Sequence, residues 1–204
     1  MQQSSPKRGK KKMVEERSIK FWQDYGSPTP TSGLEVRVAI FLVLLMLCVF
    51  ITIIGTTTRI EIDEARRLIQ EQNNLREAVK STGLQVIFGN NFMHALIMFV
   101  PIVGPCWGFY VLYNTGRFIA ALSIIERVNP VLTTLTLFFF PFTWMEYISY
   151  ALAISESLFL AYSIIRREFK REFIVASKFI VFCAILLLAA AFIEFHMIFL
   201  LELP

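Results

Sequence analysis

Two acidic residues lie inside an apolar stretch of the sequence. Glu146 and Glu156 both fall within residues 144–165, which otherwise have the composition of a membrane span. If this stretch is helical, the two carboxylates share one face and lie about 15 Å apart along the axis. Because a charge within a bilayer is costly, both should face the protein interior, pair, or be protonated. They could serve as polar contacts between helices, as parts of a proton or ion path, or as a docking site for another membrane subunit.

A second set of polar residues flanks another apolar stretch. Asn90 and Asn91 come at its start, where either could cap a helix. Asn114 and Gly116 come at its end, where glycine commonly permits a left-handed turn. We interpret these four residues as helix ends, and His94, one turn further into the stretch, as a hydrogen-bonding residue.

The middle of the same stretch predicts a kinked helix. Pro101 and Pro105 each remove a backbone donor and crowd the carbonyl four residues earlier. Since lipid cannot satisfy the freed carbonyl groups, this helix should face the protein interior. Gly104 and Gly108, four residues apart, would let another helix pack closely. The region could be a packing seam or an unwound ligand site.

Recognisable catalytic and metal-binding motifs are missing from the sequence. It contains no H-E-x-x-H, no G-x-S-x-G and no phosphate-binding loop, and it has only two histidines. Cys48, Cys106 and Cys183 lie within apolar runs and lack the spacing of a metal site. We therefore expect a protein that is not an enzyme and that holds no metal and no cofactor.

The composition predicts an all-α integral membrane protein. Of 204 residues, 55% are hydrophobic and 20 are phenylalanine, which exceeds the apolar content of a typical soluble domain. We expect about five transmembrane helices, with the second kinked. The third carries Glu126, Arg127 and Pro130 in its middle, so it either crosses fully or is broken or re-entrant. The expected spans are residues 36–56, 92–113, 117–143, 144–165 and 174–201.

Outside the spans, the sequence predicts two further segments. Residues 1–33 read as a basic, largely flexible cytoplasmic tail, which contacts anionic lipid and includes a short interfacial helix over 13–25; no specific nucleic acid is expected. Residues 34–204 form the helical transmembrane domain. Within it, residues 59–80 predict an amphipathic extracytoplasmic helix that packs on the membrane, on its own protein or on a partner.

Charge distribution predicts the orientation in the cell membrane. Basic residues gather in the N-terminal tail and again over 166–178, so both segments should be cytoplasmic. The N-terminus is then cytoplasmic and the C-terminus extracytoplasmic in a multi-pass protein. The first apolar run begins too late for a cleaved signal peptide, so we expect it to be a retained span.

The order of these motifs resembles the stage II sporulation protein M family over about residues 36–200. The matching residues are Ile87, Phe88, Asn90, Asn91, Ala95, Leu96, Gly104, Gly108, Asn114, Gly116, Pro141, Glu146 and Ala151. The chain departs from the family pattern at Thr115, which separates the Asn-Gly pair, and at Phe142-Thr143, which replaces a His-Gly dipeptide.

The resemblance implies a non-enzymatic membrane subunit or scaffold. In spore formers, the family resembles a scaffold that recruits cell-wall hydrolases, and elsewhere its role is largely undefined. The partners implied are the lipid bilayer together with other membrane proteins or a second copy of the chain. The residues themselves leave an alternative open: a small transporter or permease component that uses the broken helix and the intramembrane carboxylates.

Overall fold

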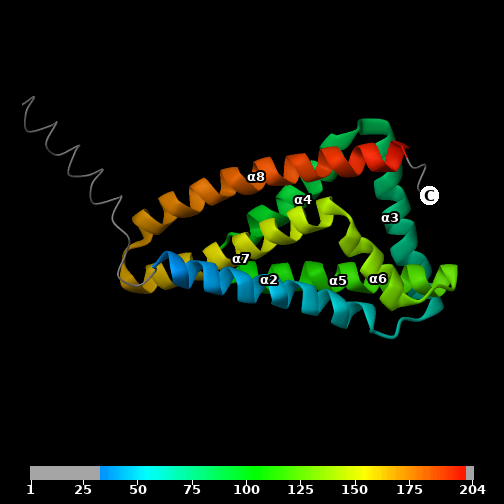
Figure 1. Ribbon diagram of the computed structural model, residues 1–204, viewed down its shortest axis with the longest axis horizontal. Coiled ribbons are helices and arrows are strands. Elements are labelled where there is room, and N and C mark those ends of the chain that lie inside the picture. Colours follow the sequence, from blue (N-terminus) through cyan, green and yellow to red (C-terminus); the bar gives the residue numbers. More distant parts are fainter. Residues whose placement is uncertain (1–32, 201–204) are drawn as a thin grey trace, which may run out of the picture. The chain divides into compact units, whose positions relative to one another are not determined.

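The computed structural model describes residues 33–200, which are almost entirely helical (Figure 1). The predicted interfacial helix over 13–25 and nearly all of the predicted tail lie outside the described residues. No strand occurs within the described range. Its helices are α2 (Leu34–Thr56), α3 (Ile62–Thr82), α4 (Leu84–Met98), α5 (Val103–Glu126), α6 (Pro130–Phe139), α7 (Pro141–Arg166) and α8 (Phe169–Leu200).

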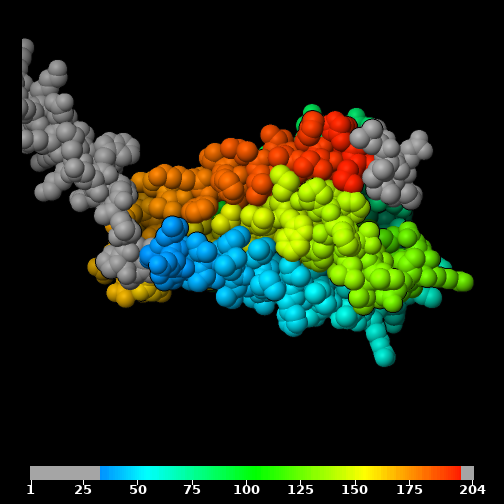
Figure 2. Space-filling model, viewed as in Figure 1, coloured from blue at the N-terminus to red at the C-terminus, as the bar shows by residue number. Residues whose placement is uncertain are grey.

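Four of these helices, α2, α5, α7 and α8, are long and apolar enough to cross a membrane. The outward faces of α2 and α8 are strongly apolar: Val43, Met46 and Ile185 are each more than 60% exposed. Residues 39–56 of α2, together with α8, make up much of the face seen in Figure 2. Large apolar side chains gathered in this way suit lipid rather than water. The prediction of an all-α membrane protein is confirmed.

The expected second span, residues 92–113, is not one kinked helix. α4 ends at Met98 and α5 begins at Val103, and the chain reverses between them so that the two helices form a hairpin (Figure 1). Pro101 and Pro105 cannot donate to the carbonyls that a continuous helix would offer them. Ile102 takes a positive φ of 70°, which a β-branched residue rarely adopts. The prolines were correctly identified as a break, but the predicted kink is in fact a reversal.

The expected third span, residues 117–143, is also divided. Its first part continues α5 to Glu126, and Arg127 then ends the helix in a left-handed conformation with φ 55°. Asn129 caps α6 by accepting a hydrogen bond from the backbone of Val131 at 2.8 Å, and Pro130 occupies the first turn. With ten residues, α6 is too short to cross a bilayer alone. The prediction of a broken segment holds, and five membrane-spanning helices are not found in the described part of the chain.

The amphipathic helix expected over 59–80 is α3, which spans residues 62–82. It lies across one end of the other helices, called here the α3 end (Figure 1). Ala65 and Val79 are buried, and α3 packs on α5 and α4. Of the three surfaces considered for this helix, the structure shows contact with its own protein. Gly83, with φ 95°, supplies the turn from α3 into α4.

α7 is the central helix of the core. It packs along α8 and also contacts α4 and α5. Ile154 of α7, Met98 of α4 and Leu187 of α8 are fully buried in one cluster. α2 joins this core partly through polar contacts, because the hydroxyl groups of Thr52 and Tyr147 lie 2.7 Å apart.

Glycines bring α2 and α5 into backbone contact. A Cβ on Gly116 would meet the carbonyl oxygen of Thr52 and the Cα of Gly55, and a Cβ on Gly55 would meet the carbonyl oxygen of Tyr113. Gly116 therefore lies inside α5 rather than at a left-handed turn, and the interpretation of it as a helix end is wrong. Its lack of a side chain serves a close helix contact.

A second glycine contact joins the hairpin to α7. A Cβ on Gly104 would meet the carbonyl oxygen of Met98 and the Oγ of Ser157, whereas a Cβ on Gly108 would meet only flexible side-chain atoms, chiefly those of Ile154. The Gly104 contact is thus the stricter of the two. Both glycines are buried.

We predict that Gly104→Ala and Gly116→Ala each destabilise the fold by about 1–3 kcal/mol, because the added methyl group would have to displace backbone atoms. Gly89→Ala is the matched control: Gly89 is helical with nothing within 4 Å of its Cβ position. It should be neutral or stabilising, since alanine favours a helix by up to about 1 kcal/mol over glycine.

Thermal unfolding of the purified variants in one detergent measures the difference, and equal stability at all three positions would refute the close contacts. Met46, which is 69% exposed, is the lipid-facing comparison for larger substitutions. Leu45, expected from sequence to face lipid or adaptable packing, is partly buried against the core and is unsuitable for this purpose.

Candidate functional site

A cavity of about 1100 Å³ lies at the α3 end. Its walls come from α3, α4, α5, α6, α7 and α8. From α7 only residues near its start contribute, and from α8 only residues near its end, so the cavity occupies one end of the bundle. Its volume is at or above the upper range of typical small-molecule sites, roughly 300–1,000 Å³.

A hydrogen bond between α4 and α7 lies in the wall of this cavity. The Nδ2 of Asn91 donates to Oε1 of Glu146, at 2.5 Å. A polar contact between helices is one of the roles that the sequence leaves open for Glu146. However, α4 starts at Leu84, so neither asparagine caps it, and both lie inside the helix with their side chains available to the cavity.

Glu146 belongs to a polar cluster drawn from four helices. Glu194 of α8 interacts electrostatically with Glu146, and Arg76 of α3 interacts with Glu194. Tyr150 lies one turn further along α7 and interacts with both carboxylates. We call Arg76, Asn91, Glu146, Tyr150 and Glu194 the Glu146 cluster. All five line the cavity.

His94 and Trp107 form a neighbouring part of the wall. Their rings lie 5.8 Å apart between centroids, and the ring of Tyr110 lies 5.7 Å from that of Trp107 at a tilt of 38°. His94 Nδ1 and Trp107 Nε1 are buried and have no hydrogen-bond partner within the described part of the protein. The indole nitrogen can only donate, so its partner must supply an acceptor.

Only some of the residues expected at a site are brought together here. Asn90, Asn91, His94, Asn114 and Glu146 line the cavity. The residues of the hairpin turn and the close helix contacts do not, and neither does Glu156. These are Pro101, Gly104, Pro105, Gly108, Gly116 and Glu156.

Glu146 and Glu156 therefore do not form one site. Glu156 is 2% exposed and lies within the core-facing part of α7, further along the helix than the cavity. The expectation that Glu146 and Glu156 share one face describes α7 taken by itself. What separates the two residues is the packing around them, since α4 and α5 close over α7 between the cavity and Glu156.

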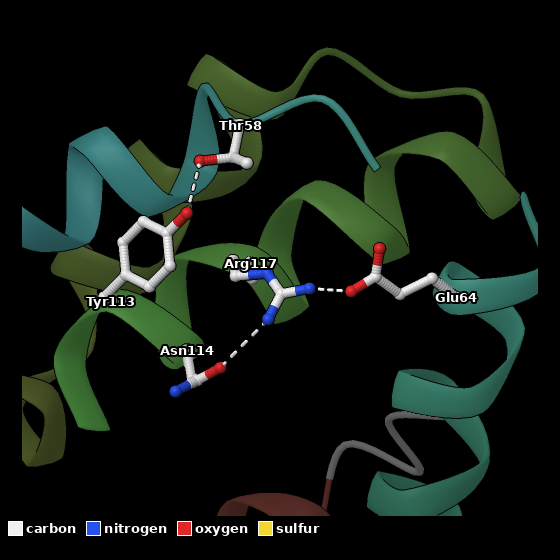
Figure 3. A network of polar contacts seen from close by, with 5 residues as sticks. All are labelled: Thr58, Glu64, Tyr113, Asn114 and Arg117. Atoms are coloured by element: carbon white, nitrogen blue, oxygen red, sulfur yellow. Dashed lines mark hydrogen bonds and ion pairs between the residues drawn. The ribbon is translucent and has the colours of Figure 1, made fainter. Parts of the chain in front are cut away.

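Asn114 has a different role from the helix end suggested by the sequence. It lies inside α5, where its Nδ2 donates to the carbonyl oxygen of Tyr110 at 2.8 Å. Its Oδ1 accepts a hydrogen bond from Nη1 of Arg117 at 3.3 Å, and Arg117 forms an ion pair with Glu64 of α3 (Figure 3). Nearby, the Tyr113 and Thr58 hydroxyl groups lie 3.2 Å apart. These contacts fix α3 to α5.

Sequence reasoning missed several residues of the site. Tyr150 could have been found, because it follows Glu146 by four residues and so shares its helix face. Trp107 was hidden by the reversal of the chain, which turns it toward His94. Arg76 and Glu194 reach the cluster from α3 and α8, and nothing local in the sequence indicates that proximity.

Searches for relatives and for metal sites add no assignment. Comparisons with protein-family models, curated proteins and solved structures found no match. Within residues 33–200, no group of three histidine, cysteine, aspartate or glutamate residues is placed to hold a metal ion.

We predict that Glu146→Gln leaves stability nearly unchanged, because glutamine keeps an acceptor for Asn91. Glu146→Leu should lower the thermal stability, since the half-buried amide of Asn91 would lose its partner at a cost of about 1–3 kcal/mol. The double variant Asn91→Leu/Glu146→Leu should lose less than the sum of the two single changes. If the glutamine and leucine variants are equally destabilised, the hydrogen bond does not stabilise the fold.

Proposed function

We propose that this chain is a non-enzymatic integral membrane subunit that serves as a scaffold in a membrane complex, in the way the resemblance to stage II sporulation protein M implies. The observation that supports this role is the firm attachment of α3 at one end of the bundle. The Glu64–Arg117 ion pair and the Thr58–Tyr113 hydroxyl contact hold α3 and its preceding loop to α5 (Figure 3).

The outward surface of α3 suits a partner in water rather than lipid. Asp63 and Arg66 form an exposed ion pair at 3.3 Å, and Arg67, Glu77 and Lys80 are also exposed. By contrast, the outward residues of α2 and α8 are apolar. A charged surface carried on a fixed helix gives a partner a preformed contact area, which reduces the entropy lost on binding.

We also propose that α2, α7 and α8 cross the membrane, while α4 and α5 enter and leave on the same side. Two contacts support this arrangement. At its turn the hairpin meets α7 where Ser157 donates to the carbonyl oxygen of Val100 at 2.7 Å. Ser157 comes nine residues before Arg166, so the turn stops about 13 Å short of that end of α7. At the other extreme, Arg117 of α5 reaches α3.

Basic residues orient this topology. The turn between α7 and α8 and the start of α8 carry Arg166, Arg167, Lys170 and Arg171, which favours the cytoplasm. The α3 end is then extracytoplasmic. With three crossings, the N-terminal tail is cytoplasmic and the C-terminus extracytoplasmic in the cell membrane. The orientation is the same as for five crossings, because both numbers are odd.

Single cysteines test this topology in a variant without Cys48, Cys106 and Cys183. A reagent that cannot cross membranes should label cysteines placed at Asn73 and Val128 in intact cells, but not one placed at Glu168. With five crossings, Val128 would lie inside the bilayer and remain unlabelled. Absence of labelling at Val128, with labelling retained at Asn73, would therefore overturn the hairpin topology.

A transporter or permease component is the second candidate function, and the cavity favours it. The cavity does not continue past the core, because Met98, Ile154 and Leu187 are fully buried beyond it. Transport would thus require the hairpin to move. The two candidates separate experimentally: a scaffold copurifies with a stoichiometric partner in mild detergent, whereas a carrier moves solute when reconstituted alone in liposomes.

We predict that Glu64→Arg reduces recovery of the copurifying partner, because an arginine at position 64 would repel Arg117 and release α3 from α5. The exchange Glu64→Arg/Arg117→Glu should restore recovery by re-forming the pair with opposite polarity. Glu168→Arg is the control, since it makes the same charge change at an exposed position in the turn between α7 and α8, away from α3 and its proposed contact surface. Mass spectrometry of affinity-purified complexes provides the measurement. A protein that copurifies with no stoichiometric partner, even as wild type, would refute the scaffold.

A further inference from the structure

We propose that the cavity at the α3 end binds an organic cation with an apolar body. This inference depends on neither of the two candidate functions, because a bound cation could be a transported solute or a ligand that regulates a scaffold. It rests on the charge of the cavity, on its aromatic surface and on its volume.

The charged residues of the cavity wall are predominantly acidic. Glu71, Glu126, Glu146 and Glu194 line it, against a single lining arginine, Arg76, among the described residues. Arg76 interacts with Glu194, and Asn91 donates one hydrogen bond to Glu146. A carboxylate can accept several hydrogen bonds, so Glu146 keeps capacity for a ligand. A concave wall of one charge sign concentrates ligands of the opposite sign.

Aromatic rings lie beside these carboxylates. Tyr150 interacts with both Glu146 and Glu194, and the rings of Trp107 and Tyr110, 5.7 Å apart between centroids, belong to the same wall. Aromatic faces attract ammonium and similar cations within about 6 Å of the ring centroid, most strongly when water is excluded. Carboxylates together with rings therefore select a cation that also has apolar surface, rather than a hydrated metal ion.

The size of the cavity completes the description of the ligand. His94 and Trp107 both contribute to the cavity wall, but their nitrogen atoms Nδ1 and Nε1 are themselves buried away from its open space, so they place no further requirement on the ligand. The ligand class is thus a cation with an apolar body. At about 1100 Å³ the cavity has ample space for such a molecule.

Tetraphenylphosphonium tests the charge preference, because tetraphenylborate has nearly the same shape and the opposite charge. Equilibrium dialysis of the purified full chain in nanodiscs should show saturable binding of the phosphonium ion and none of the borate ion. Glu146→Gln and Glu194→Gln should each weaken phosphonium binding at least about tenfold, which corresponds to about 1.4 kcal/mol. Glu77→Gln removes the same charge from an exposed α3 position outside the cavity wall and should leave binding unchanged.

Three outcomes would overturn the proposal: equal binding of both ions, no saturable binding of the phosphonium ion, or unchanged affinity in both cavity variants. Gel filtration and thermal unfolding establish that each variant is folded, and the two glutamine variants provide independent readings. Copurification of a partner does not enter the assay, so failure of the scaffold proposal and failure of this one are distinguishable.

Discussion

The reversal of the chain at residues 99–102 is the constraint on which the rest of the structure depends. Proline at 101 and 105 prevents a continuous helix, and the backbone groups freed at the break need partners inside the protein. Ser157 of α7 meets this need by donating to the carbonyl oxygen of Val100. Gly104 has no side chain, so α5 can return directly beneath the end of α4. The turn between α4 and α5 is therefore fixed to α7 beside Ser157.

Once the hairpin is fixed at that level, the position of the polar residues follows. The open end of the hairpin formed by α4 and α5 lies at the α3 end, so the polar side chains of α4 face the start of α7. Asn91 thereby meets Glu146, and His94 meets Trp107. The continuation of α5 beyond the hairpin carries Arg117 to Glu64, which fixes α3 across the opening. Cavity, polar cluster and cross-lying helix are consequences of one local reversal.

The sequence was sufficient to predict what depends on local composition. Apolar runs identified the long helices, the amphipathic pattern identified α3 to within a few residues, and Glu146 was singled out as a candidate for polar contacts between helices. The reversal itself could not be predicted, because a proline break can produce a kink or a turn with similar local preferences. Which of them forms depends on Ser157, more than fifty residues away in the sequence. Gly116 was misread for the same reason, since its contact with Gly55 exists only after α2 and α5 pack.

α7 shows how the chain combines close packing with polar residues in one helix. Ser149, Ala153 and Ser157 recur every four residues, and all three are fully buried. Their small size lets neighbouring helices approach, and the carbonyl oxygen of Ser149 lies 3.6 Å from the Cys183 sulfur of α8. Larger residues at these positions would push the hairpin and α8 away from α7. The separation would remove the partner of Val100 and open the core below Glu146. The small residues of α7 thus keep the cavity closed on its core side, and they confine the Glu146 cluster to the end of the bundle where α3 supplies Arg76.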